Sequence, residues 1–350
     1  IVTCIDDTDL NSGVVKIDDM VVFVPNLLIG EKAKIKIVKV NKKYAFGIII
    51  ELLKPSINRQ ELTCEVAKTC GGCQLQHMSY AYQLDYKYKH VKKLFEDIEV
   101  KPILGMDNPW YYRNKAQFPV KIKDGKVQMG FYRQHSNDVV TCKECKIQDH
   151  VINEVFSFIQ KKITLKMAQD LRHVFIRHSS TDEIQVVFIG KNEKNIISLS
   201  DQLKNTFANI KSIVFNYNTR NDNVILGDTY KVLYGNDSII EECLGNKVKL
   251  HFKAFFQVNP KQMEVLYSQA IKAANLSGNE TCIDMYAGTG TIGMAVSKHA
   301  KSVIGVEIVK EAVDNANDNT KMNHLDHCHY VCQDATDFAH DHKDDKIDVI

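Results

Sequence analysis

A glycine-rich segment between residues 281 and 293 has the spacing of a cofactor-binding loop. It reads Thr-Cys-Ile-Asp-Met-Tyr-Ala-Gly-Thr-Gly-Thr-Ile-Gly, so Gly288 and Gly290 follow a stretch typical of a buried strand. Glycine lets the backbone approach a ligand closely, and a following helix offers free N–H groups. Glu307 comes near the end of the next predicted strand, where a carboxylate can accept both hydroxyls of a ribose.

Two nucleoside cofactors fit this loop. Gly288-x-Gly290-x-x-Gly293 satisfies the dinucleotide fingerprint, which on its own is a weak pattern. Asp284 favours S-adenosylmethionine, because an acid four residues before Gly288 can reach the methionine end of that cofactor. In a nicotinamide enzyme the same acid would face a pyrophosphate. The pattern therefore favours a methyltransferase over a dehydrogenase, and a strand–helix turn without a ligand is the least favoured alternative.

Five of the ten cysteines are spaced as metal ligands: Cys64, Cys70, Cys73, Cys142 and Cys145. One four-ligand scheme pairs the two Cys-x2-Cys segments, 70 with 73 and 142 with 145, in a tetrahedral zinc site. The other scheme takes the first three cysteines and one distal cysteine for a cubane iron–sulfur cluster. The spacing leaves both open, with free buried thiols as a third alternative.

The composition excludes a disordered chain and a membrane-spanning chain. At 350 residues, with 44% hydrophobic and 25% charged residues, the sequence predicts two or three globular domains. It has no run of 18 apolar residues and no charged-then-apolar leader, so we expect a cytoplasmic protein with no membrane partner, and a monomer. The chain starts at Ile1 and stops at Ile350 inside an apolar run, and we therefore expect a fragment of a longer protein.

The N-terminal residues 1–53 read as a small basic barrel. Strands are predicted over residues 13–16, 20–24, 32–40 and 44–52, separated by turn residues. The third strand alternates lysine with apolar residues, which predicts one cationic face and one buried face. A basic face suits a phosphate backbone, although a purely structural barrel fits this stretch equally well.

The rest of the chain divides into a mixed part, residues 54–245, and an alternating part, residues 246–350. The mixed part predicts helices over 80–96 and 149–164 and strands over 117–122, 126–133, 172–178 and 184–189, an α+β domain. In the last part Asn259-Pro260 begins a helix. Strands at 281–285, 303–308, 329–333 and 347–350 then alternate with helices at 291–300 and 310–322, the rhythm of a doubly wound parallel sheet.

Four motifs in order resemble one enzyme family. Cys64-Glu-Val-Ala-Lys-Thr-Cys70-Gly-Gly-Cys73, the basic barrel before it, Phe256-Gln257-Val258-Asn259 and Asp284-Met-Tyr-Ala-Gly-Thr-Gly resemble the bacterial 23S rRNA (uracil-5-)-methyltransferases over essentially the whole chain. The resemblance implies a multidomain protein. It would have an N-terminal OB-like TRAM barrel, an α+β central domain with a [4Fe-4S] cluster, and a truncated Rossmann-like class I methyltransferase domain.

The resemblance also implies roles for individual residues. Cluster ligands would be Cys64, Cys70, Cys73 and Cys145, with Cys142 a bystander. Residues that bind S-adenosylmethionine would be Gln257, Asp284, Tyr286, Gly288, Gly290, Glu307 and Asp334. Thr291 replaces an asparagine that some members use beside the methionine moiety. Phe255 resembles the aromatic on which the target uracil stacks, although a core phenylalanine is the alternative, and Arg113 and Lys115 would contact RNA.

The implied reaction is methylation of C5 of a uridine in 23S rRNA through a covalent cysteine–C6 adduct with the flipped base. The nucleophilic cysteine and the general base of the family are expected beyond residue 350, so no catalytic residue is assigned. Cys282, Cys328 and Cys332 are not candidates, because positions 282 and 332 are predicted to lie in buried strands. A tRNA T-loop uracil methyltransferase and a catalytically silent RNA-binding relative are the alternatives, and the modified uridine is not identified by the sequence.

Overall fold

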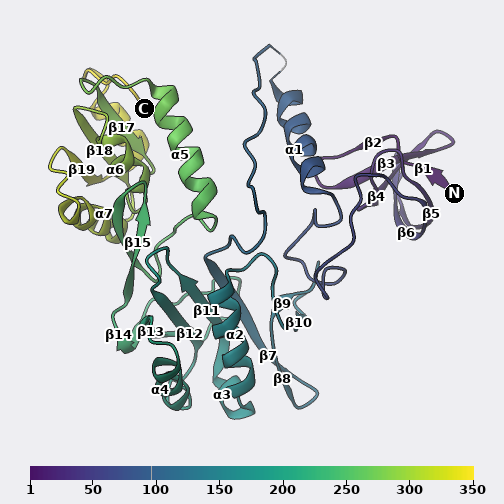
Figure 1. Cartoon of the computed structure of the whole chain (residues 1–350), viewed down its shortest axis with the longest axis horizontal. Coiled ribbons are helices and arrows are strands. Elements are labelled where there is room, and N and C mark those ends of the chain that lie inside the picture. Colours follow the sequence, from purple (N-terminus) through teal and green to yellow (C-terminus); the bar gives the residue numbers. More distant parts are fainter. Residues whose placement is uncertain (96) are drawn as a thin grey trace. The chain divides into compact units, whose positions relative to one another are not determined.

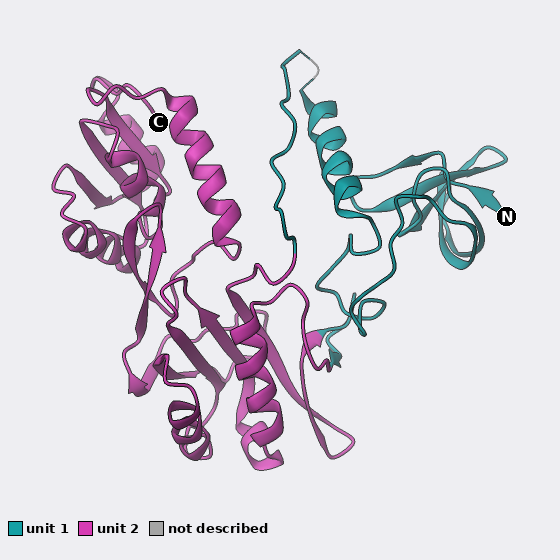
Figure 2. Ribbon diagram, viewed as in Figure 1, with its two compact units in different colours: residues 1–109, 132–140 teal, residues 110–131, 141–350 magenta. Residues whose placement is uncertain are grey.

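The computed structural model describes residues 1–95 and 97–350 (Figure 1). The chain forms two compact units (Figure 2). The first contains residues 1–109 and 132–140, and the second contains residues 110–131 and 141–350. The boundary predicted at residue 245 lies inside the second unit. Within the described residues no helix is both long enough and apolar enough to cross a membrane.

The first unit begins with a six-stranded sheet in the order β1-β5-β6-β4-β3-β2. Its strands are β1 (Val2–Thr3), β2 (Asp6–Asp7), β3 (Ser12–Ile17), β4 (Met20–Pro25), β5 (Lys32–Val40) and β6 (Tyr44–Lys54). Small and β-branched side chains such as Val15, Val22 and Ala33 form its core. The four strands predicted between residues 13 and 52 are confirmed, with small shifts at their ends.

The two-faced character predicted for β5 holds only for its first half. Lys32, Lys34 and Lys36 are exposed while Ala33 is fully buried. Val38 and Val40, in the second half, are 54% and 64% exposed. The reason is that the barrel core contacts this strand only near its beginning, at Ala33 and Ile35.

Helix α1 (Tyr80–Leu94) is fixed to the barrel through Tyr86. The Tyr86 hydroxyl donates to the carbonyl of Thr8 and accepts from the N–H of Asn11. The fully buried Glu31 accepts 2.6 Å and 2.7 Å bonds from the Arg59 guanidinium, so this buried charge is fully paired. The predicted helix 80–96 is confirmed to Leu94, and residue 96 lies outside the described residues.

The second unit contains a six-stranded mixed sheet in the order β14-β13-β12-β11-β7-β8. Its strands are β7 (Lys115–Lys123), β8 (Lys126–Met129), β11 (Leu171–His178), β12 (Ile184–Gly190), β13 (Ile210–Tyr217) and β14 (Tyr230–Gly235). Three helices contact this sheet: α2 (His150–Lys162), α3 (Leu165–Asp170) and α4 (Ile197–Thr206). The strand predicted over 126–133 is wrong as a single strand, because β9 (Phe131–Tyr132) leaves the sheet to pair with β10 (Val139–Val140).

A hairpin, β15 (Ser238–Cys243) with β16 (Asn246–His251), leads to helix α5 (Pro260–Ala274). The alternating elements follow: β17 (Thr281–Met285), α6 (Thr291–Ser297), β18 (Ser302–Glu307), α7 (Lys310–Met322), β19 (Cys328–Cys332) and α8 (Ala335–Asp341). The three strands are parallel, in the order β17-β18-β19. The predicted βαβ rhythm is confirmed, although the strand predicted over 347–350 is present only as a parallel bridge between Val349 and Cys282.

Candidate active site

The carboxyl ends of β17, β18 and β19 bring three acidic residues to one edge of the sheet. Asp284 is the penultimate residue of β17, Glu307 ends β18, and Asp334 follows β19. The carboxyl edge of a parallel sheet is where open α/β folds bind ligands. The structure therefore brings to one edge three residues that the sequence singled out, of which the first and last lie 50 positions apart in the chain.

Asp284 connects β17 to the beginning of α6. Its carboxylate accepts the N–H of Gly293 at 2.9 Å. Burial raises the pKa of Asp284 to about 6; the bond from Gly293 opposes the rise, and the nearby charge of Glu307 adds to it. A buried carboxylate beside a second carboxylate is best stabilised by a cation. A ligand with a positive charge is therefore favoured at this edge.

Glu307 holds the glycine loop from the neighbouring strand. One of its oxygens accepts the N–H of Gly288 at 2.9 Å, and the other accepts the N–H of Val309 at 3.0 Å. Gly288 has a φ of +56°, and the position where a side chain would begin has no atom within 4 Å. The backbone at Gly288 therefore has open space on the side where a side chain would begin.

Gly290 has a different reason to be glycine. Its φ is +79°, and a Cβ added there would lie 2.5 Å from the Tyr330 ring. A Cβ added at Gly293 would lie 2.5 Å from the Tyr330 hydroxyl oxygen, and one added at Gly305 would lie 1.9 Å from the ring. Three glycines therefore make room for one tyrosine, a role that the sequence analysis missed because the residues come from four separate elements.

The remaining predicted cofactor residues surround the same edge. Tyr286 is 80% exposed and has a φ of 61°, a strained backbone for a tyrosine. Asp334 caps α8, where one of its oxygens accepts the N–H groups of Thr336 and Asp337. Gln257 is half-buried. It follows Phe256, which packs in the same core as Ala287 of the glycine loop.

Phe255 and Lys115 lie together on the second unit. The Phe255 ring is 69% exposed, and the Lys115 ammonium is 5.9 Å from its centroid. Two further residues hold the segment around Phe255. The Arg177 guanidinium donates to the carbonyl of Ala254 at 2.9 Å, and the carbonyl of Val258 accepts from the N–H of Asn114 at 3.0 Å.

Sequence reasoning did not single out Arg177, one of two arginines in β11, although it directly follows the apolar run Val174-Phe175-Ile176. It is 1% exposed, and burial lowers its pKa to about 10 although Glu241 opposes this shift. Arg113, one of the predicted RNA contacts, has a buried Nε without a hydrogen-bond partner among the described residues. Tyr111, two residues before Arg113, is half-buried: its ring stacks on His150 at 3.8 Å and its hydroxyl donates to Glu144 at 2.9 Å.

The predicted cluster ligands are divided between the two units. Cys64, Cys70 and Cys73 belong to one loop of the first unit, whose backbone is tied to residues 132–134. Cys64 acts electrostatically on Cys70, and the N–H of Gly72 donates to the Cys70 sulfur at 3.4 Å. These thiols have the right donor chemistry for an iron–sulfur cluster. Across residues 1–95 and 97–350, however, no group of three or more Cys, His, Asp or Glu side chains converges as metal ligands do.

Cys145 belongs to the second unit, where Asn153 holds it. The Asn153 side chain accepts from the Cys145 N–H at 2.8 Å and donates to its carbonyl at 3.0 Å. Cys142 is 5% exposed. Cys282 and Cys328 are buried, but the prediction that Cys332 is buried is wrong, because β19 ends there and its side chain is exposed.

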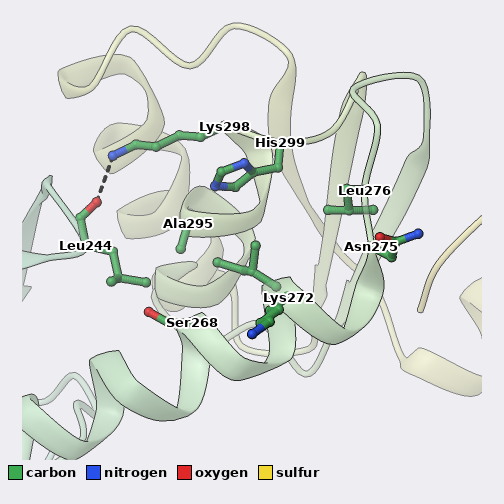
Figure 3. Close-up of a pocket in the computed structure, with 9 residues that line it drawn as sticks. Leu244, Ser268, Lys272, Asn275, Leu276, Ala295, Lys298 and His299 are labelled. Atoms are coloured by element: carbon green, nitrogen blue, oxygen red, sulfur yellow. Dashed lines mark hydrogen bonds between the residues drawn. The ribbon is translucent and has the colours of Figure 1, made fainter.

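A cavity of about 530 Å³ lies away from this edge, at the ends of α5 and α6 (Figure 3). Ala295, Lys298 and His299 line it, and Lys298 donates to the carbonyl of Leu244 at 2.8 Å. The glycine loop precedes α6, whereas the cavity lies where α6 ends. Since none of the predicted cofactor residues lines the cavity, it is not the candidate cofactor site.

Comparison with known proteins places this geometry in a family. The tRNA (Uracil-5-)-methyltransferase family model matches residues 79–347, and the TRAM domain model matches residues 6–50. An uncharacterized RNA methyltransferase of Halalkalibacterium halodurans is 41% identical, with 95% of this chain and 77% of the relative covered. One from Staphylococcus aureus is 39% identical, with 95% and 78% covered.

A solved structure has the same fold over most of the chain. It is the Pyrococcus abyssi tRNA (uracil-54, C5)-methyltransferase in complex with S-adenosyl-L-homocysteine, with a TM-score of 0.73 and 22% identity. The match covers 95% of this chain and 79% of that one. The C-terminal fold is therefore that of a class I methyltransferase. The chain belongs to the tRNA (uracil-5-)-methyltransferase family, and it is an S-adenosylmethionine-dependent RNA (uracil-5-)-methyltransferase with an N-terminal TRAM domain.

Proposed function

We propose that this enzyme methylates C5 of a uridine in 23S rRNA. The observation that carries the cofactor side of this proposal is the carboxylate pair Asp284 and Glu307, each of which accepts an N–H from the glycine loop. Such a pair favours a cationic nucleoside such as S-adenosylmethionine over an anionic dinucleotide. The ribosomal substrate is supported by the cysteine loop that precedes the methyltransferase domain, a motif of the rRNA enzymes that the sequence resembles.

The tRNA T-loop is the second candidate substrate. The Pyrococcus abyssi structure is named for uracil-54 of tRNA, and its match covers 95% of this chain. The presence of an N-terminal barrel therefore does not separate the two substrates. At 22% identity this likeness concerns the fold alone.

In the proposed cofactor site each residue has a separate task. Glu307 would accept the ribose hydroxyls, and the oxygen of Asp334 that does not cap α8 would accept the adenine amine. Gly288 and Gly290 would form the close backbone wall, and Tyr286 would cover the nucleoside. Asp284 and Gln257 would face the methionine end, where Asp284 meets positive charge.

We propose a covalent route for the methyl transfer. C5 of uracil is a poor nucleophile, so a cysteine thiolate adds to C6 and C5 then takes the sulfonium methyl. A base removes the C5 proton, and elimination frees the thiolate. Because C6 is inaccessible in a stacked helix, the uridine is flipped, and Phe255 would stack on it while Arg113 and Lys115 contact the RNA. We assign the nucleophile to none of the ten cysteines in residues 1–350.

The decisive experiment measures methyl transfer from labelled S-adenosylmethionine to unmodified 23S rRNA and to unmodified tRNA, followed by mapping of the modified nucleotide. We expect label at C5 of a uridine in 23S rRNA. Label in tRNA alone would establish the second candidate. Tight binding of NADH with no binding of S-adenosylmethionine would refute the cofactor assignment, and RNA binding without transfer to either RNA would indicate a silent relative.

We further propose that Cys64, Cys70, Cys73 and Cys145 hold a [4Fe-4S] cluster with a structural task, since methyl transfer needs no electron. Iron and acid-labile sulfide measured after anaerobic purification test this assignment. We expect four of each per chain, and one zinc without iron would overturn the ligand set. Cys73→Ser should lower stability or RNA affinity, whereas Cys142→Ser, the matched control, should keep the cluster.

The larger organisation is part of the same proposal. Residues 1–53 would form the RNA-binding barrel, residues 54–245 the central domain and residues 246–350 the cofactor-binding domain. We also propose that the protein works as a monomer in the cytoplasm. Size-exclusion chromatography with light scattering tests the oligomeric state, and a stable dimer would contradict it.

A further inference from the structure

Lys115 has an environment that suits a task beyond holding the RNA backbone. It is the first residue of β7, and its direct partner across the sheet is Arg177 on β11. Its ammonium lies 6.0 Å from the centroid of Phe175 and 5.9 Å from that of the exposed Phe255. Both distances are within the range of a cation–π contact. Lys115 is therefore a half-buried cation beside the exposed ring of Phe255.

This cation has no anionic partner in the structure as described. Among residues 1–95 and 97–350, no carboxylate or other acceptor bonds the Lys115 ammonium, and the charges that act on it are those of Arg177 and Arg113. The two guanidinium groups have different surroundings. That of Arg177 bonds backbone carbonyls, and the Nε of Arg113 is buried without an acceptor. Burial, and after it the charges of Arg177 and Arg113, together lower the pKa of Lys115 to about 8. A negative charge that forms at this point would be strongly stabilised.

We propose that Lys115 stabilises the enolate oxygen of the target uracil while the covalent adduct exists. This inference rests on the proposed function, because it needs a uracil stacked on Phe255. The Phe255 ring and the lysine that flanks it are held by a common support: Arg177 fixes Ala254, and Asn114 fixes Val258. A uracil stacked on this ring would present its exocyclic oxygen O4 at its edge, and the Lys115 ammonium lies 5.9 Å from the centroid of the same ring.

In the proposed step, electron pairs move from the thiolate towards O4 of the uracil. The thiolate pair forms the S–C6 bond, the C5–C6 π pair becomes the C4–C5 bond of the enolate, and the C4–O4 π pair moves onto O4. The Lys115 ammonium donates a hydrogen bond to O4 and keeps its proton. The enolate pair then forms the C5–methyl bond as the sulfonium–methyl bond of the cosubstrate breaks. Loss of the C5 proton to a base restores the C5–C6 double bond, and the thiolate leaves.

The test compares Lys115→Met, Lys115→Arg and a matched control, Lys123→Met, in the full-length protein with whichever RNA the wild type methylates. Lys123 is exposed at the far end of the same strand. We expect kcat at saturating RNA and S-adenosylmethionine to fall by about 100-fold in Lys115→Met, the loss typical of one oxyanion donor. Its Kd for RNA should stay within about threefold. Lys115→Arg, which keeps the charge, should recover at least a tenth of the wild-type kcat, and Lys123→Met should be unchanged.

A second measurement follows adduct formation directly. RNA with 5-fluorouridine at the target position traps the covalent complex, because fluorine at C5 cannot leave as a proton. Trapping should be slowed in Lys115→Met as much as kcat. A higher Kd for RNA with an unchanged saturated kcat would overturn the proposal and make Lys115 a phosphate contact. If Lys115→Met unfolds, Lys115→Gln carries the same comparison. A wild type that methylates no uridine in either RNA would instead refute the proposed function.

Discussion

The hydroxyl of Tyr330 donates to the carbonyl of Gly290 at 2.8 Å, from beneath the loop that the candidate cofactor site is built on. Tyr330 itself is held by Asn317, whose side chain bonds both its N–H and its carbonyl at 2.9 Å. The ring is 4% exposed and belongs to the core of the domain. The shape of the glycine loop therefore depends on a buried side chain from the third strand of the sheet.

Tyr330→Phe should remove this bond and keep the ring that fills the space below the glycines. One net hydrogen bond contributes about 1 kcal/mol, so we expect both the free energy of unfolding and the affinity for S-adenosylmethionine to fall, the latter by about fivefold. Thermal unfolding and calorimetry with S-adenosylhomocysteine measure the two effects. An unchanged affinity would show that the loop keeps its shape without the tyrosine hydroxyl.

Two glycine substitutions should separate loop support from ligand contact. Gly305→Ala places a Cβ 1.9 Å from the Tyr330 ring, and overpacking of this kind costs about 1–3 kcal/mol of stability. Gly288→Ala meets open space but adopts a φ of +56°, so its stability cost is about 1 kcal/mol. Its methyl group would face the ligand, and cofactor affinity should fall by at least tenfold. The opposite ranking in denaturation and binding experiments would contradict this division of roles.

The elements around the site could be predicted because their signals are local. Asn259-Pro260 begins α5 as expected, and the alternation after it gave β17, β18, β19 and α7 nearly to the residue. The support of the loop could not be predicted, because Gly305 and Tyr330 approach only once β18 and β19 are paired in register. Cys332 illustrates the reverse error, since an apolar pattern does not tell at which residue a strand emerges from the core.

Asp284 should make cofactor binding depend on pH. Its carboxyl titrates at about 6 in the folded protein, against an ordinary value of 3.8, and the positively charged cosubstrate prefers the ionised form. The Kd for S-adenosylmethionine should therefore rise as the pH falls below 6, by up to tenfold per unit. Asp284→Asn should bind more weakly at pH 7.5 and show no such slope. Calorimetry between pH 5 and 8 measures both, and equal slopes would exclude Asp284 as the titrating group.

The same carboxyl should lower the stability of the cofactor-free protein at neutral pH. Between pH 3.8 and 6 the folded state binds the proton more tightly than the unfolded state, so this contribution to stability is lost as the pH rises through that range. Asp284→Asn should then stabilise the cofactor-free protein at pH 7.5 by up to about 3 kcal/mol. Urea denaturation of the wild type and of Asp284→Asn, each with and without cofactor, tests whether the substitution raises stability while it weakens cofactor binding.

The residues of the candidate RNA site could be named from the sequence, but their contacts could not be predicted. Phe255, Arg113 and Lys115 were identified by resemblance, but nothing local indicates that Lys115 and Phe255, 140 residues apart, lie within 6 Å. The role of Arg177 could not be predicted either, because it requires the carbonyl of Ala254, which lies 77 residues further along the chain. Contacts of this kind follow from how β7, β11 and the loop before α5 pack together.

His178 should stabilise the second unit in a way that depends on pH. Its Nδ1 lies 2.9 Å from Asp149, the cap of α2, and its Nε2 lies 2.9 Å from Asp182. Burial by itself would lower the pKa of His178, but the hydrogen bonds and charges of Asp149 and Asp182 outweigh it and raise the pKa above its ordinary 6.5. The stabilisation is therefore fully present below pH 6.5 and is lost as the pH rises through the higher folded value. His178→Gln should cost about 1–2 kcal/mol at pH 6 and much less at pH 9. His299→Gln, at an exposed histidine, is the control and should leave the free energy of unfolding unchanged at both pH values. An equal loss of stability at pH 6 and pH 9 in His178→Gln would show that the charge of the imidazole plays no part.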